Sequence, residues 1–207
     1  MIKGYHHLYG RYVLGNLATN ILGGLQYTLA TDTMLQSVET IQGSDTAGIS
    51  AGMNYIGKDI IGQTASLWFM QKIGKYSDRS PKRFFNGILG LQQVSILAET
   101  MTFLMPGNMA FLGLAGTANV AKNISFCGTG AINTKVIAKI AESDTRQNGE
   151  VYTHLTTIAS LGSSLGMATG IFAIYMLPDP GIRMGLVPVI GAVKYSIMRW
   201  SLKGLYL

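Results

Sequence analysis

Charged side chains are scarce in this sequence: Asp, Glu, Lys and Arg make up 13% of its 207 residues, against about 25% in soluble domains. Proline is also rare, with 5 residues, whereas glycine contributes 26 and methionine 11. The mean hydropathy is +0.28. Few charges combined with much glycine are typical of membrane helices, which pack closely through small residues. The composition therefore favours an integral membrane protein.

Cysteine and histidine are too few to indicate a disulfide framework or a metal site. The one cysteine, Cys127, has no histidine close to it in sequence, and we interpret it as a small packing residue. His6 and His7 are adjacent and cannot share one helical face as metal ligands, and His154 is isolated. The segment "CGTGAIN" (127–133) lacks the third glycine of a nucleotide-binding loop and follows no predicted strand. We expect no enzyme activity, no metal and no nucleotide cofactor.

Long uncharged stretches give the organisation of the chain. Residues 12–31, 101–121 and 151–178 contain no charged side chain, and about 20 apolar residues suffice for a helix to cross a bilayer. These stretches lack the period-two alternation of strands, and turn-forming segments separate them. We therefore predict an all-α fold with one membrane domain over 1–207, the alternative being a soluble all-α bundle. The expected helices cover about 12–34, 46–73, 81–105, 108–141, 149–177 and 184–203.

The basic residues are distributed unevenly along this predicted topology. With six crossings, both tails and the loops after the second and fourth helices lie on one side of the membrane. Of the 16 basic residues, all except Arg183, Lys58 and Lys122 fall on that side, including Lys194. This asymmetry agrees with the positive-inside rule, so the net charge of +6 indicates topology and anionic lipid rather than nucleic acid. We expect both termini on the positive side, facing the matrix or the cytoplasm.

Glycines recur at four-residue spacing in two of the predicted helices. Gly162, Gly166 and Gly170 follow one another in the fifth helix, and Gly48 and Gly52 lie in the second. Such a stripe allows two helices to approach closely within a membrane. The stripes indicate either tight packing within the chain or an interface with another subunit.

Four charged residues interrupt the predicted spans. Lys58 and Asp59 are adjacent in the second helix, Glu99 lies in the third, and Lys122 lies in the fourth. Charges in a membrane face the bundle interior, a water-filled cavity or one another. They therefore indicate either a path for a solute or proton, or a structural network in which Lys122 pairs with Glu99 or Asp59.

The connection between the second and third predicted helices carries a spaced motif, "GKYSDRSPKRF" (74–84). Its motif positions are Gly74, Asp78, Arg79, Lys82 and Arg83. Gly74 is expected to end the helix, and Asp78 to pair with nearby guanidinium groups. This spacing resembles the G-x-x-x-D-R/K-x-G-R/K-R/K loop of the major facilitator superfamily, except that a proline replaces the second glycine. The resemblance implies one six-helix half of such a transporter. The alternative is that the serine and proline at 80–81 simply begin the third helix.

Three long segments form a second recognisable pattern. In chain order they are "GNLATNILGGLQYTLATDTMLQSVETIQGSDTAGISAGMNYIGKDIIGQ", "KRFFNGILGLQQVSILAETMTFLMP" and "ANVAKNISFCGTGAINTKVIAKIAESDTRQNGEV". They resemble the root UVB-sensitive (RUS) family of plant and animal organelle proteins, over residues from about 10 to 171. The matching positions are Lys58, Asp59, Gly62, Glu99, Pro106, Lys122 and Asn123. "NGEVYT", with Glu150, stands where the family has E-G-S-Q-E-T.

The two resemblances set the functional expectation. The RUS family is linked to light sensitivity, vitamin B6 homeostasis and auxin transport, with no agreed chemistry. Major facilitator transporters enclose their substrate between two halves, and this chain resembles one. We therefore expect a non-catalytic accessory or scaffold subunit of a larger organelle membrane complex, with the mitochondrial respiratory chain or ATP synthase in the inner membrane as the first choice. Its partners would be other membrane subunits and anionic lipids such as cardiolipin. The alternative is a homodimeric carrier of a small metabolite that uses Lys58, Asp59, Glu99 and Lys122.

Overall fold

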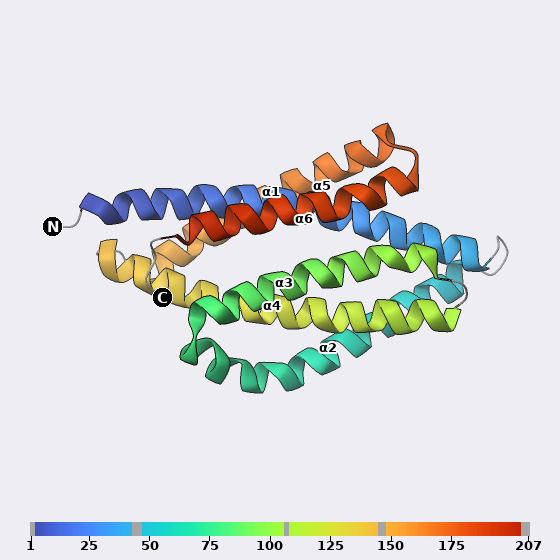
Figure 1. The fold of residues 1–207 in the computed structure, drawn as a ribbon, viewed down its shortest axis with the longest axis horizontal. Helices are drawn as coiled ribbons and strands as arrows, with labels where there is room; N and C mark the ends of the chain where they lie inside the picture. The colour runs from blue at the N-terminus through green and yellow to red at the C-terminus, as the bar shows by residue number, and fades with distance from the viewer. Residues whose placement is uncertain (1–2, 43–46, 106–107, 145–147, 204–207) are drawn as a thin grey trace.

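The chain is almost entirely helical (Figure 1). The structure is a computed structural model that describes residues 3–42, 47–105, 108–144 and 148–203, with side chains described over 9–36 and over most of 56–203. Its helices, with one short 3-10 turn, are α1 (Lys3–Gln42), α2 (Ala47–Arg79), α3 (Pro81–Met101), η1 (Thr102–Leu104), α4 (Asn108–Asp144), α5 (Asn148–Met176) and α6 (Pro180–Ser201). No strand occurs in these ranges, and the prediction of an all-α fold is confirmed.

Prolines at the first helical position begin two of the helices. Pro81 starts α3 after Ser80, whose φ of −153° lies outside the helical region and whose side chain makes no capping hydrogen bond. Pro180 starts α6, and the Asp179 carboxylate accepts a hydrogen bond of 2.8 Å from the Gly181 amide. Proline suits this position because its missing N–H would have no partner in the first turn. The last helix therefore starts at Pro180 rather than at 184.

The motif between the second and third helices is mostly helical, which corrects the sequence interpretation. α2 continues to Arg79, so Gly74 lies inside the helix and does not end it. The chain leaves the helical conformation at Ser80 alone. The reason is that the residues after Gly74 contain no breaker until Pro81, which disfavours a helical conformation in the residue before it.

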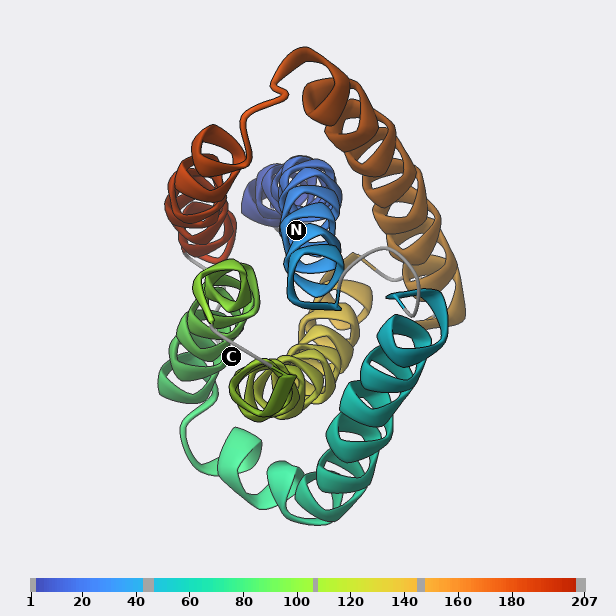
Figure 2. The same cartoon turned by 90° about the vertical axis from the view of Figure 1, so that its right-hand side faces the viewer.

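α1 and α4 occupy the centre of the helix arrangement, as the end-on view in Figure 2 shows. α1 packs against α5 and α6, α4 packs against α2 and α3, and contacts between α3 and α6 join these two groups. One apolar core cluster gathers near the start of α1 and includes Tyr12, Phe85 and Val136. A second cluster includes Leu29 and Ile96. The interior between these groups is thus formed by helices far apart in sequence.

The connections between helices alternate between two ends of the bundle (Figure 1). The first turns of α1, the α2–α3 connection, the last turns of α4, the first turns of α5 and the last turns of α6 lie at the same end. Most of the described basic side chains belong to that end, which we call the basic end: Arg11, Lys72, Lys75, Arg79, Lys82, Arg83, Lys135, Lys139, Arg199 and Lys203. Arg146 lies outside the described residues.

The glycine stripe of α5 packs directly on α1. A Cβ atom added at Gly166 would overlap the Ile21 carbonyl oxygen, and one added at Gly24 would overlap the Ser163 carbonyl oxygen. Gly162 lies against Leu17 in the same manner. The two backbones are therefore in contact at these glycines, which is a packing role within the chain. Gly48 and Gly52 lie in α2, in a part whose packing falls outside the described residues.

Two of the described helices are long and apolar enough to cross a membrane. They are α5, with a mean hydropathy of 1.5 over its best window, and α6, with 1.2. Few residues of the α5 window are buried within the chain, and its exposed side chains include Leu161, Ile171, Phe172 and Tyr175. By length and composition, two of the described helices qualify as candidate membrane spans, which is fewer than the six expected.

Candidate functional site

The charges predicted to interrupt the spans meet in the interior. The Glu99 carboxylate of α3 lies 3.1 Å from the Lys58 ammonium of α2 and 2.8 Å from the Lys122 ammonium of α4. Lys58 and Glu99 are each 1% exposed. Asp59, whose side chain is 43% exposed, lies 3.7 Å from Lys58. Two ammonium groups and two carboxylates thus stand together, with no excess charge.

Further hydrogen bonds connect the polar groups around this cluster. The Asn119 side-chain amide donates to the Lys58 carbonyl at 2.9 Å and to Asp59 at 3.2 Å. Gly62 faces Asn119 and leaves room for it. The Lys122 ammonium also lies 5.3 Å from the centre of the Tyr27 ring. A charge-balanced cluster of this kind holds α2, α3 and α4 together and has little capacity left to bind a charged solute.

A second buried pair connects α1 and α6 towards the other end of the bundle. Arg183, 3% exposed, lies 2.6 Å from Asp32. Its guanidinium group also donates to the Pro178 carbonyl at 3.3 Å. This pair neutralises the basic residue that the sequence placed alone on the side opposite the basic end.

A partly open cavity of about 1120 Å³ lies beside the first cluster and is lined by α1, α3, α4, α5 and α6. Its volume is at the upper limit of ordinary small-molecule sites. The described lining carries two charged residues, Asp32 and Lys194, among many hydroxyl, amide and apolar side chains. Because Asp32 is paired with Arg183, the charge that the lining leaves uncompensated is that of Lys194.

Lys194 is buried in α6, which corrects its assignment to the positive side. Its side chain is 8% exposed, and its ammonium donates to the Gln92 side-chain oxygen of α3 at 3.2 Å. Among the described residues no carboxylate lies within ion-pair distance of it. The sequence does contain a signal: Lys194 is the one charge in the apolar run 184–198, and a charge within a span indicates function.

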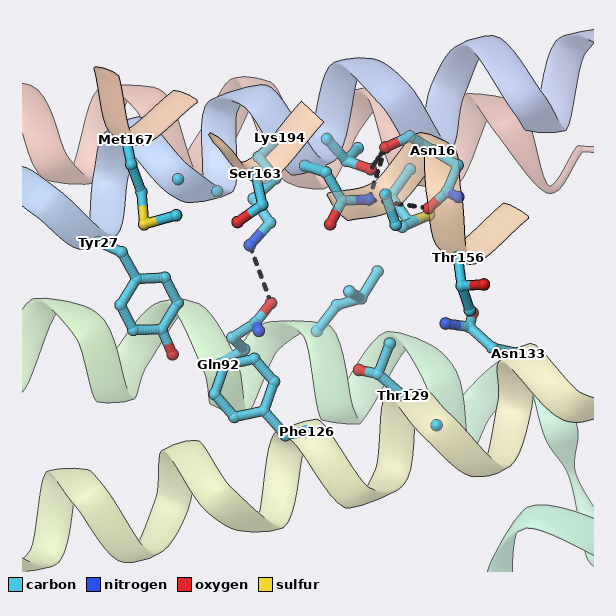
Figure 3. Close-up of a pocket in the computed structure, with 18 of the residues that line it drawn as sticks. Asn16, Tyr27, Gln92, Phe126, Thr129, Asn133, Thr156, Ser163, Met167 and Lys194 are labelled. Atoms are coloured by element: carbon cyan, nitrogen blue, oxygen red, sulfur yellow. Dashed lines mark hydrogen bonds between the residues drawn. The ribbon is translucent and has the colours of Figure 1, made fainter. Parts of the chain in front are cut away.

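Aromatic, amide and hydroxyl side chains line different parts of this cavity, as Figure 3 shows. Tyr27 and Met167 lie at one end with Phe126 below them, and Asn133 and Thr156 lie at the other. The rings of Tyr27 and Phe126 stack with centroids 5.8 Å apart. The Lys194 ammonium points into the space between the two ends, towards Gln92. The cavity thus suits a ligand with an apolar part, a polar part and an anionic group.

The residues of the α2–α3 motif lie at the basic end, away from this cavity. Asp78 pairs with Lys135 of α4, so the partner that the structure shows is a lysine rather than the expected guanidinium group. Lys82 and Arg83 occupy the first turn of α3 and are exposed. The packing around Gly74 lies outside the described residues.

The cysteine and the third histidine lie apart from each other. Cys127 is half-buried on α4. The His154 Nδ1 atom lies 2.6 Å from the Tyr9 hydroxyl at the basic end. Among the residues that the structure describes, no three His, Cys, Asp or Glu side chains gather as metal ligands would.

The comparison with family models gives a match over nearly the whole chain. A model described as "Vitamin B6 photo-protection and homoeostasis domain" (UVB_sens_prot) matches residues 5–202. The chain belongs to this family. Because the match spans nearly the whole sequence, all five helices that line the cavity are part of the RUS family domain. Neither the curated proteins nor the solved structures gave a significant match to this RUS family chain.

Proposed function

We propose that this RUS family chain is a non-catalytic membrane protein that binds and carries a small amphipathic metabolite. The observation that supports this proposal best is the cavity of about 1120 Å³ with the buried, uncompensated Lys194 on its wall. A purely structural interior would be close-packed. The carrier expected from the sequence used Lys58, Asp59, Glu99 and Lys122, and we now assign those residues to holding the helices together.

Membrane insertion of the whole bundle is part of this proposal. Large apolar side chains are exposed along α2 as well as on the two candidate spans, for example Ile60, Leu67 and Trp68. Water-soluble monomers rarely expose apolar patches of this extent. The accumulation of basic residues at one end supports an orientation with that end facing the matrix or the cytoplasm.

Two copies of the chain would form the complete carrier. The loop motif resembles that of one transporter half, and transporters of that kind consist of two halves. The exposed apolar surface of α5 is available for contact with lipid or with a second copy.

Vitamin B6 compounds are the first solutes to test, because the description of the matched family refers to vitamin B6 homoeostasis. The purified protein is reconstituted into liposomes, and uptake of labelled pyridoxal phosphate and pyridoxine is measured. We expect uptake above that of protein-free liposomes. Ala159→Trp, which places a large side chain on the cavity wall, should abolish it.

The matched control is Ala168→Trp, an exposed position on the same helix. We expect this variant to carry solute as the unmodified protein does. Uptake that is equal in Ala159→Trp and Ala168→Trp would contradict a route through the cavity. Uptake no greater than in protein-free liposomes, for these and other small anionic metabolites, would reject the carrier.

The exposed surface of α5 favours a second candidate function, that of an accessory subunit in a larger organelle membrane complex. Tyr175 is 81% exposed and Ile171 65%, and such side chains can pack on other membrane subunits or on cardiolipin. The inner mitochondrial membrane is the location we propose for it. The native mass in mild detergent distinguishes this function from the carrier. Co-migration with other polypeptides supports an accessory subunit, and a mass of twice the chain alone rejects it.

A further inference from the structure

We propose that Lys194 is the anion-binding residue of the cavity, and that the ligand is a small molecule with one phosphate or carboxylate group and an aromatic or otherwise flat apolar body. This inference rests on the proposed function, because it requires that the cavity hold a solute. It goes further by assigning the ligand's chemical class and the residue that selects it.

The first support is the charge balance of the interior. Lys58 and Lys122 share Glu99 with Asp59 nearby, and Arg183 has its own carboxylate. Lys194, 8% exposed, donates a hydrogen bond to an amide oxygen, that of Gln92. Burial of a charge without a counter-charge is costly. A bound anion would supply that counter-charge, so binding gains free energy at this position that other parts of the lining cannot provide.

The second support is the geometry around the ammonium group. An ammonium has three N–H donors, and one of them reaches the Gln92 side-chain oxygen at 3.2 Å. A Cβ atom added to Gly23 would lie 3.3 Å from the Lys194 Nζ atom. The glycine therefore leaves space beside the ammonium, and Gln92 holds the group in place from α3. The donors that remain can reach an anion in the cavity.

The third support is an aromatic surface on the wall of the same cavity. The Tyr27 hydroxyl has no hydrogen-bond partner among the described residues, although its residue lines the cavity. Buried hydroxyls are normally satisfied. Its ring stacks on Phe126, with Met167 close by in Figure 3. This end of the cavity offers an apolar surface for a flat body, and the Tyr27 hydroxyl beneath it is buried.

The test compares two probes that differ in charge. The full-length protein is placed in nanodiscs of zwitterionic phosphatidylcholine, and calorimetry measures binding of naphthyl phosphate and of neutral naphthol. We expect naphthyl phosphate to bind at least about tenfold more tightly. In Lys194→Gln its affinity should fall by about 30-fold, the lower range for loss of a buried charge partner, while that of naphthol changes little.

Two further variants separate charge from folding. Lys194→Arg keeps the positive charge and should keep the preference for the phosphate. Lys75→Gln removes a charge from the exposed surface of the basic end and should leave both affinities unchanged. Repeating the titration with phosphatidic acid in the nanodisc identifies the source of the anion, because competition indicates a lipid headgroup and its absence indicates a soluble metabolite.

Failure of this inference differs from failure of the proposed function. Equal affinity for the two probes in the unmodified protein, or an unchanged preference in Lys194→Gln, would overturn the role of Lys194 while leaving a cavity that binds solutes. Binding of neither probe, together with no uptake of any solute by liposomes, would reject the proposed function as well.

Discussion

The Glu99 carboxylate lies 3.1 Å from the Lys58 ammonium, and each of these residues is 1% exposed. The same carboxylate also binds Lys122, so one acidic side chain of α3 neutralises charges from α2 and α4. Removing one partner of a buried ion pair destabilises a protein far more than replacing both partners with well-packed apolar residues. Substitutions in this cluster therefore test directly how much the buried ion pairs stabilise the packing of α2, α3 and α4.

Glu99→Gln should destabilise the protein by about 3–5 kcal/mol, because two buried ammonium groups would lose their shared carboxylate. The measurement is thermal unfolding in detergent followed by circular dichroism. Glu142→Gln is the control, since Glu142 is exposed and pairs with Lys139 on the surface of α4, where such pairs contribute about 0–1 kcal/mol. Equal melting temperatures for the two variants would show that the cluster does not stabilise the fold.

Asp32→Asn should destabilise the contact between α1 and α6, because Arg183 would be left buried without a carboxylate. Since Asp32 is partly exposed, we expect a loss near the lower end of about 3–5 kcal/mol. Adding Arg183→Gln to Asp32→Asn should recover most of the unfolding free energy that Asp32→Asn loses. The check is a double-mutant cycle on unfolding free energies, and strictly additive effects would contradict a direct interaction.

Gly166→Ala should weaken the packing of α5 on α1 by about 1–3 kcal/mol, the usual cost of overpacking, since the new methyl group would overlap the Ile21 carbonyl oxygen. Gly87→Ala is the matched control: it lies inside α3, where an added Cβ meets nothing within 4 Å. That change should be neutral or stabilising by up to about 1 kcal/mol. Indistinguishable stabilities would mean that the α1–α5 contact is looser than described.

The proposed membrane orientation can be mapped with single cysteines in a Cys127→Ser background. Lys75→Cys and Lys203→Cys lie at the basic end, and Met109→Cys lies at the start of α4 at the other end. In sealed vesicles, a membrane-impermeant maleimide should label the first two together and Met109→Cys from the opposite side only. Labelling of all three from one side would reject a bundle that spans the bilayer.

Local sequence signals anticipated much of the helical layout. Hydropathy and turn residues depend on neighbouring positions, so the uncharged stretch 151–178 could be assigned to a helix without knowledge of the rest of the chain, and α5 occupies Asn148–Met176. Helix ends were less predictable. Gly74 stays within α2, because a single glycine in a helix interior is tolerated at a cost of about 1 kcal/mol and the proline at 81 gives the stronger stop signal.

The cavity could not be predicted in the same way. Lys194 is the one charge in the last apolar run, but the sequence does not show which side chains it faces. Its contacts depend on α6 packing against α1 and α3, which turns the side chain towards Gln92. Likewise the sequence allowed Lys122 to pair with either Glu99 or Asp59, and the packing of α3 against α4 selected Glu99.

The sequence by itself determined the all-α class, the concentration of basic residues at one end and the membership of the RUS family, because composition, hydropathy and motif spacing are properties of the linear chain. Only the tertiary structure decided that Glu99 neutralises Lys58 and Lys122, whereas Lys194 has no carboxylate partner among the described residues. Charge pairing depends on distances of a few ångströms between residues as far apart in sequence as Gln92 and Lys194. Helix packing alone sets those distances.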